Sequence, residues 1–227
     1  MNKNFIKIGI LSLAIVIPIF LYLFLVTFGQ NTHKIKTFHP VEVIEKVDDN
    51  GKKKIDTIFH KVEDFKLLTH LGDSFSTASI PNSIYVLDFF FSRCGGICPK
   101  MTKQLLRVQE RFKDRKDFKI LSLSVDQDFD SPEVLTSYAK RFGANDSLWL
   151  FMAGNRSKTF YLAKTQFFLN AMEDNTGEQE EFVHSEKLVL VDKNRNIRGY
   201  YNGTLPEEVD RLMVEMDILF FEYSKQK

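Results

Sequence analysis

The longest apolar stretch of the chain lies near its N-terminus, where residues 8–28 carry no charged side chain. About 20 consecutive apolar residues are enough for a helix to cross the hydrocarbon core of a bilayer, so the stretch predicts a transmembrane anchor. Lys3 and Lys7 precede it without any acidic residue. Because a positive flank favours the cytoplasmic side of a membrane, we expect the rest of the chain on the opposite side.

A cleaved signal peptide is the alternative interpretation of this stretch. The apolar region of a signal peptide is usually about 7–15 residues long and ends in a small-residue cleavage site. The apolar stretch here is longer, and residues 26–30 do not resemble such a site. We therefore expect an uncleaved anchor over residues 1–28.

The next segment, residues 29–60, reads as a polar tether with a short β-hairpin. Asp48-Asp49-Asn50-Gly51 is a strong turn signal between two β-forming runs. From residue 61 to 227 the chain has no internal repeat or low-complexity tract, and we interpret this part as one domain.

Within residues 61–227, apolar runs alternate with helical patterns. Residues 84–91 form a nearly continuous apolar run of β-forming residues, which predicts a central strand covered on both faces. Further strands are expected at residues 119–125 and 148–152. A helix is expected from Pro99, because apolar residues recur there at helical spacing, at Met101, Leu105, Val108 and Phe112.

The second half of the domain continues this alternation. Ser131-Pro132 is typical of a helix start and Gly143 of a helix end, and another helix should begin near Ser157. Strands at residues 188–191 and 197–201 should form a hairpin, followed by a last helix from Pro206 to about Tyr223. The predicted fold class is α/β, a mixed sheet flanked by helices.

Charge and cysteine content narrow the classes of function. Lys plus Arg is 31 and Asp plus Glu is 30, a formal net charge of +1. Nucleic-acid-binding domains normally show a basic excess, so we expect no nucleic-acid partner. The two cysteines are too few for a disulfide scaffold, a thiolate-only zinc site or an iron–sulfur cluster.

The two cysteines stand where the central strand gives way to the next helix, in Cys94-Gly95-Gly96-Ile97-Cys98-Pro99. Ligands of α/β sheets bind near the carboxyl ends of strands, and a helix N-terminus lowers the pKa of a nearby thiol. A structural disulfide is one alternative, although closing so short a loop removes little chain entropy. Covalent haem attachment needs a histidine where Pro99 stands. Redox chemistry and binding of a soft metal remain.

A metal site would need a further ligand. Four of the five histidines precede the central strand and are expected in the tether or at the surface: His33, His39, His60 and His70. The fifth, His184, immediately precedes the hairpin strand, in a segment that a thioredoxin-like fold places beside the cysteine loop. Two thiolates and an imidazole suit copper, whereas structural zinc needs a fourth protein ligand.

At these residues the sequence resembles the Sco (SenC) family of copper-binding proteins. The likeness rests on CxxxCP at Cys94, Cys98 and Pro99, on Ser124-Val125-Asp126 with residues 130–135 downstream, and on His184 before residues 188–192. The resemblance implies a thioredoxin-like fold that binds one copper ion, Cu(I) or Cu(II), through Cys94, Cys98 and His184. It implies delivery of that copper to the dinuclear copper centre of cytochrome c oxidase.

The anchor and the resemblance carry expectations about setting and partners. From the anchor we expect a single-pass protein of the cell inner membrane, with its C-terminal domain facing the periplasm or extracytoplasmic space. A bacterial membrane is favoured over the mitochondrial inner membrane, the alternative, because no Arg- and Ser-rich leader precedes the apolar stretch. By the resemblance, the protein's partner would be the copper-accepting subunit of the oxidase, and the protein would act as an assembly factor rather than an enzyme. Asp126 would lie near the metal as an outer-sphere group; a solvated carboxylate at a strand end is the alternative. Arg93 departs from the expected small or uncharged residue before the first cysteine.

The main competing function is a membrane-anchored thiol–disulfide oxidoreductase. Asp88 lies six positions before Cys94, where thioredoxins resemble this chain in having a buried acidic residue that assists proton transfer. The CxxxC spacing, and the absence of a proline between Pro132 and Pro206, argue against it. A combined copper and thiol role, a non-metal interaction module and, more remotely, a peroxidase complete the alternatives.

Overall fold

The computed structural model describes residues 3–28, 34–47, 53–169 and 185–225 and divides into two units, Met1–Lys34 and Ile35–Lys227. The first unit contains helix α1 (Lys3–Phe28), which has Pro18 inside it. Within the described ranges, no helix combines the length and apolar character needed to cross a membrane. The expected anchor therefore stays a prediction.

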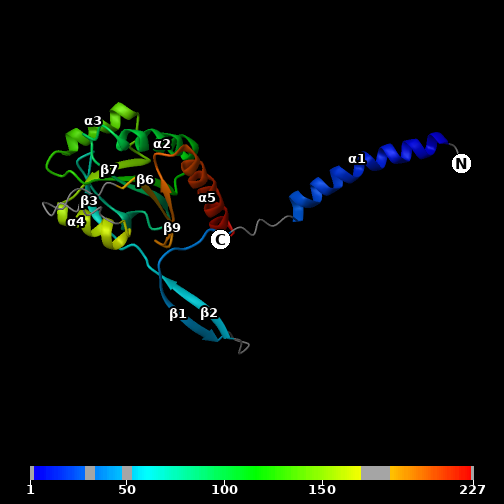
Figure 1. Cartoon of the computed structure of the whole chain (residues 1–227), viewed down its shortest axis with the longest axis horizontal. Helices are drawn as coiled ribbons and strands as arrows, with labels where there is room; N and C mark the ends of the chain where they lie inside the picture. The colour runs from blue at the N-terminus through cyan, green and yellow to red at the C-terminus, as the bar shows by residue number, and fades with distance from the viewer. Residues whose placement is uncertain (1–2, 29–33, 48–52, 170–184, 226–227) are drawn as a thin grey trace. The chain divides into compact units, whose positions relative to one another are not determined.

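The second unit is built on a seven-stranded mixed sheet (Figure 1). Its strands, in spatial order, are β4 (Ser74–Ser76), β3 (Lys66–Thr69), β7 (Trp149–Ala153), β6 (Phe118–Ser124), β5 (Ile84–Phe90), β8 (Lys187–Val191) and β9 (Ile197–Asn202). Strands β5, β6 and β7 are parallel, and the outer strands on both sides are antiparallel to their neighbours. The predicted central strand is confirmed, since every residue of β5 is buried.

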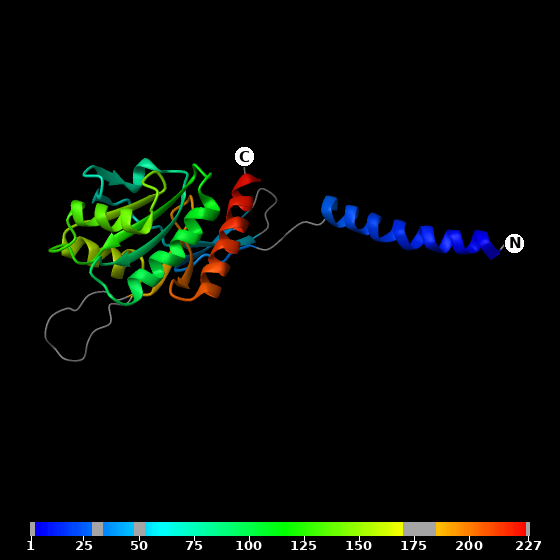
Figure 2. The ribbon, with the colours of Figure 1, turned by 90° about the horizontal axis from the view of Figure 1, so that it is seen from above.

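Helices cover both faces of this sheet (Figure 2). The helical segments are η1 (Thr77–Ser79), α2 (Ile97–Phe112), α3 (Pro132–Phe142), α4 (Arg156–Tyr161), the π-helical turn η2 (Leu162–Gln166) and α5 (Pro206–Ser224). Side chains of α2, α3 and α5 pack in one core and those of α4 and η2 in the other. Alternate residues of β5 point into the two cores, so Val86 and Phe90 face α2 while Leu87 and Phe89 face the opposite layer.

The signals at helix ends act as the sequence predicts. Ser131 accepts a hydrogen bond from the Val134 N–H and so caps α3. Gly143 ends α3 with φ of 75°, a left-handed conformation that glycine adopts without strain. Helix α2 begins at Ile97, two residues before the predicted start at Pro99, and therefore includes Cys98 in its first turn.

A two-stranded ribbon precedes the sheet in the chain. Strands β1 (Pro40–Val47) and β2 (Lys53–Phe59) pair with each other and with no strand of the seven-stranded sheet. At the base of the ribbon, the Phe38 N–H donates to the carbonyl of Ile197 at 2.9 Å. The predicted hairpin is confirmed, and its turn lies outside the described residues.

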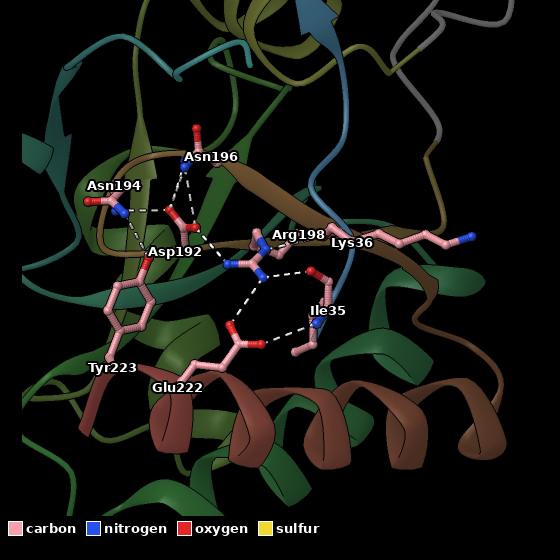
Figure 3. A network of polar contacts seen from close by, with 8 residues as sticks. All are labelled: Ile35, Lys36, Asp192, Asn194, Asn196, Arg198, Glu222 and Tyr223. Carbon is pink, nitrogen blue, oxygen red and sulfur yellow. Dashed lines mark hydrogen bonds and ion pairs between the residues drawn. The ribbon is translucent and has the colours of Figure 1, made fainter. Parts of the chain in front are cut away.

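A buried ion network fixes the segment before the ribbon to the domain (Figure 3). In the β8–β9 connection, Asp192 accepts two backbone N–H groups of its own turn at 2.9 Å and the Arg198 guanidinium at 3.0 Å. Arg198 also donates to the Ile35 carbonyl at 2.7 Å and to Glu222 of α5 at 3.3 Å. Asp192 and Arg198 are 1% and 8% exposed, so this network is an interior feature.

Candidate metal site

The two cysteines lie at the carboxyl end of β5, on either side of the start of α2. Cys94 is in the connecting loop and is partly exposed, whereas Cys98 is in the first helical turn and is only 3% exposed. Both are free thiols. The side chain of Cys98 donates a hydrogen bond to the Cys94 sulfur, so the two sulfurs are close together.

The two thiols have opposite acidities. Burial alone would raise the pKa of Cys94, but hydrogen bonds from the backbone N–H groups of Cys98, Gly96 and Ile97 outweigh it and lower that pKa below its ordinary value. Burial raises the pKa of Cys98 strongly, and the nearby charges of Cys94 and Asp88 raise it further. Cys94 is therefore the first of the pair to become a thiolate, the form that binds metals and attacks disulfides.

A buried carboxyl group lies beneath the pair. Asp88, in the middle of β5, is 2% exposed and accepts a hydrogen bond from the Ser122 hydroxyl at 2.5 Å. That hydroxyl accepts in turn from the Trp149 indole N–H at 2.8 Å. Burial raises the pKa of Asp88 to about 7, against the smaller opposing effect of the Ser122 hydrogen bond. The expected acidic residue is thus present, and it titrates near neutral pH.

Asp126 does not lie free in solvent at its strand end, and that alternative interpretation is wrong. Its side chain is 3% exposed and its carboxylate binds Arg93 Nε at 2.5 Å. The Arg93 guanidinium also lies 5.2 Å from the centre of the Phe129 ring. Arg93, which differs from the residue expected before Cys94, is therefore paired with the Asp126 carboxylate that follows β6.

A second carboxylate, Asp130, holds the residue before Arg93. Asp130 is 1% exposed and accepts from the Ser92 N–H at 3.1 Å, from the Ser92 hydroxyl and from the Ser124 hydroxyl at 2.5 Å. Sequence reasoning missed this role. The available signal was the spacing between Ser124, the buried last residue of β6, and Asp130. A carboxylate six residues after a strand end can fold back to that end and close a loop. Two carboxylates of the β6–α3 loop thus position the approach to Cys94.

The histidines of the described chain are all engaged away from the cysteines. His39 Nε2 lies 2.7 Å from the Tyr200 hydroxyl, and His60 Nε2 lies 3.2 Å from the Gln166 carbonyl. His70, expected at the surface, is 3% exposed and lies 3.0 Å from Asp146; that expectation is wrong because its ring packs edge-on against Phe151 in the interior.

Within the described residues, no three His, Cys, Asp or Glu side chains are grouped as a metal would require. His33 and His184 lie outside these residues. Strand β8 runs antiparallel to β5, with Leu87 opposite Val189 and Tyr85 opposite Val191. The N-terminal end of β8, and the buried Ser185 before it, therefore lie toward the end of β5 that leads to Cys94.

Comparison with known proteins decides the family. A model of the SCO1/SenC family matches residues 54–214. The chain belongs to the SCO1/SenC family. The SCO1 protein homolog of Bacillus subtilis is 27% identical to it over 154 residues, which cover 67% of this chain and 79% of that protein.

Two solved structures show the same fold. BsSco, described as a member of the Sco family of cytochrome c oxidase assembly proteins with a disulfide switch, is 26% identical and superposes with a TM-score of 0.60 over 70% of this chain and 93% of its own. Arabidopsis thaliana ScoI, solved with copper bound, is 19% identical and gives a TM-score of 0.57 over 71% of this chain and 99% of its own. The predicted thioredoxin-like mixed sheet with flanking helices is confirmed.

Proposed function

We propose that this SCO1/SenC protein is a copper metallochaperone whose cargo is held by Cys94, Cys98 and His184. The observation that supports it best is the hydrogen-bonded pair of sulfurs at the N-terminus of α2. Neighbouring thiolates are soft ligands that select Cu(I), and an imidazole beside them also accommodates Cu(II). Copper bound to Arabidopsis ScoI supports the same cargo.

His184 is proposed as the third ligand by elimination and by topology. Each described histidine already has another partner. His184 immediately precedes Ser185 in the chain, and the register of β8 against β5 puts the N-terminal end of β8, which follows Ser185, toward the cysteine end of the sheet. Asp126 is proposed to act from outside the coordination sphere, by holding Arg93 and with it the loop of Cys94.

The unequal exposure of the cysteines suggests how cargo would leave. An acceptor's ligands would reach the partly exposed Cys94 side first, while the buried Cys98 retains its bond until the exchange is complete. We propose the copper-accepting subunit of cytochrome c oxidase as the acceptor, in line with the assembly role described for BsSco. We also propose that residues 8–28 anchor the chain in the inner membrane, with the domain on the extracytoplasmic side.

The experiment is a competition titration of the reduced full chain against a chromophoric Cu(I) chelator. The native chain should bind about one copper, and Cys94→Ser, Cys98→Ser and His184→Ala should each weaken binding at least about 100-fold, since even outer-sphere partners of a metal cost 10- to 100-fold. His33→Ala is the matched control and should bind like the native chain. Native affinity in Cys94→Ser would overturn the ligand assignment.

Thiol–disulfide exchange is the second candidate, and the raised pKa of Asp88 beneath Cys98 favours it. The Cys94 thiolate would attack a sulfur of a target disulfide and release the other target sulfur as a thiolate. Cys98, giving its proton to Asp88, would then attack the Cys94 sulfur of the mixed disulfide and release the second target sulfur as a thiolate. The target gains two electrons from the cysteine pair and takes its two protons from Asp88 and from water, and the pair becomes a disulfide. This activity predicts reduction of insulin disulfides that His184→Ala leaves unchanged, whereas a copper role alone predicts none.

A further inference from the structure

Within the part of the chain that the structure describes, the β1–β2 ribbon leaves two strand edges unpaired. Among the described strands, β1 and β2 pair only with each other (Figure 1). A two-stranded ribbon is at best marginally stable in water, and an open strand edge is a template on which another strand can pair. Proline and a bulge interrupt β1 only at its base, at Pro40 and Glu42, so neither blocks the remaining length of that edge.

One face of the ribbon exposes aliphatic side chains. Val43 is opposite Thr57, and Glu45 is opposite Ile55, so these residues share a face. On that face Val43 is 65% exposed and Ile55 70% exposed. Val41, in the register shift at the base of β1, is 69% exposed. Such exposure on an unpaired ribbon indicates a surface that another chain covers.

The charges of β1 favour a second copy of this chain as the partner that covers this surface. Within the ribbon, Lys46 binds Asp56 at 2.6 Å and Lys53 binds Glu45 at 3.0 Å. Glu42 has no ion-pair partner among the described residues. If β1 pairs antiparallel with a second β1 so that Ile44 stands opposite Ile44, each Glu42 stands opposite a Lys46. Opposite charges facing each other across two strands stabilise that register.

We propose that β1 pairs antiparallel with β1 of a second copy of this chain, centred on Ile44, to give a four-stranded sheet. The pairing satisfies the outer edge of β1 and places Glu42 against Lys46 twice. Val43 of each copy then lies diagonal to Val43 of the other, within reach of side-chain contact. This association is independent of the copper site, because no residue of the ribbon is a proposed ligand.

A charge exchange tests the register in the full chain, held in detergent and studied by sedimentation equilibrium. Glu42→Lys and Lys46→Glu should each weaken self-association about tenfold, since each creates two like-charge pairs. The double variant Glu42→Lys/Lys46→Glu should restore it, although the Lys46–Asp56 pair within the ribbon stays broken. A native chain that is monomeric at tens of micromolar, or a double variant weaker than both single ones, would overturn the proposal.

Cross-linking tests the pairing directly, in a chain whose own cysteines are replaced by serine. Ile44→Cys should form a disulfide-linked dimer under mild oxidation because residue 44 faces its own copy. Thr57→Cys, on the other strand of the same ribbon, is the matched control and should remain monomeric. Equal cross-linking at both positions would contradict pairing through the outer edge of β1. Binding of the ribbon to lipid vesicles by a chain that stays monomeric would contradict the second copy as its partner.

Discussion

Two buried aspartates lie toward opposite ends of the sheet and have different partners. Near the β8–β9 turn, Asp192 faces the Arg198 guanidinium and two backbone N–H groups. Toward the cysteine end, Asp88 faces a neutral hydroxyl, that of Ser122. At the first end the carboxylate is held by an ion pair and by backbone donors, whereas at the second end burial raises the pKa of Asp88 to about 7.

This difference separates a structural end of the domain from a chemical end. The Asp192 network joins the segment at Ile35, strand β9 and helix α5, so its charges serve to hold three parts of the chain together. The cysteine end contains a carboxyl group that can gain or lose a proton near neutral pH, a thiol of lowered pKa and a thiol of raised pKa. Groups of this kind cluster at functional sites.

Asp192→Ala removes the carboxylate at the centre of the buried ion network and has the largest expected effect on stability. Among the residues that the structure describes, the substitution leaves the buried Arg198 with Glu222, at 3.3 Å, as its one charged partner. We expect a loss of about 3 kcal/mol in the free energy of unfolding, the lower end of the range for breaking a buried ion pair. Urea denaturation measures it.

The matched control for this substitution is Asp117→Ala, which removes a more exposed carboxylate paired with Lys193 and Arg115. It should cost no more than about 1 kcal/mol. Copper affinity should stay native in both variants, because the network is at the other end of the sheet. Equal destabilisation by the two substitutions would remove the distinction between a buried and an exposed network.

Asp88→Asn tests the cysteine end of the sheet, and its expected effect on the free energy of unfolding is smaller and depends on pH. Because the folded-state pKa of about 7 lies above the ordinary value of 3.8, the stability due to Asp88 is present at low pH and is lost as pH rises through 7. The native chain should therefore lose about 2–3 kcal/mol between pH 5 and pH 8 from this group, and the asparagine variant should not.

Urea denaturation of the native and Asp88→Asn chains at pH 5 and pH 8 measures this difference. Asparagine keeps an acceptor for the Ser122 hydroxyl, so the two chains should be of similar stability at low pH and diverge at pH 8, with the variant more stable. A stability difference that is the same at both pH values would mean that Asp88 does not titrate in this range.

Much of the fold could be predicted because its signals are local. The continuous apolar run of β5 and the Ser131 and Gly143 ends of α3 depend on neighbours within a few residues, and each was confirmed. The cysteine loop could be located for the same reason, as the junction of a strand and a helix. The anchor, the His184 ligand and the copper acceptor stay predictions.

What could not be predicted depends on contacts between distant segments. His70 was expected at the surface because it lies in the early β region, before the central strand, but Asp146 and the backbone of Phe151 give it partners in the interior. The ion pair of Arg93 with Asp126 joins residues 33 positions apart. No local sequence pattern indicates such a pairing. From the sequence, Arg93 therefore differs from the uncharged residue expected before Cys94, and only the structure shows that Asp126 of the β6–α3 loop pairs with it.

The most direct measurement of the central claim is X-ray absorption spectroscopy of the copper-loaded full chain. If Cys94, Cys98 and His184 hold the metal, copper should have two sulfur neighbours and one imidazole nitrogen. Cys94→Ser and Cys98→Ser should each leave one sulfur, and His184→Ala should remove the imidazole alone. A spectrum with only oxygen and nitrogen neighbours, or one unchanged by either serine substitution, would contradict the account.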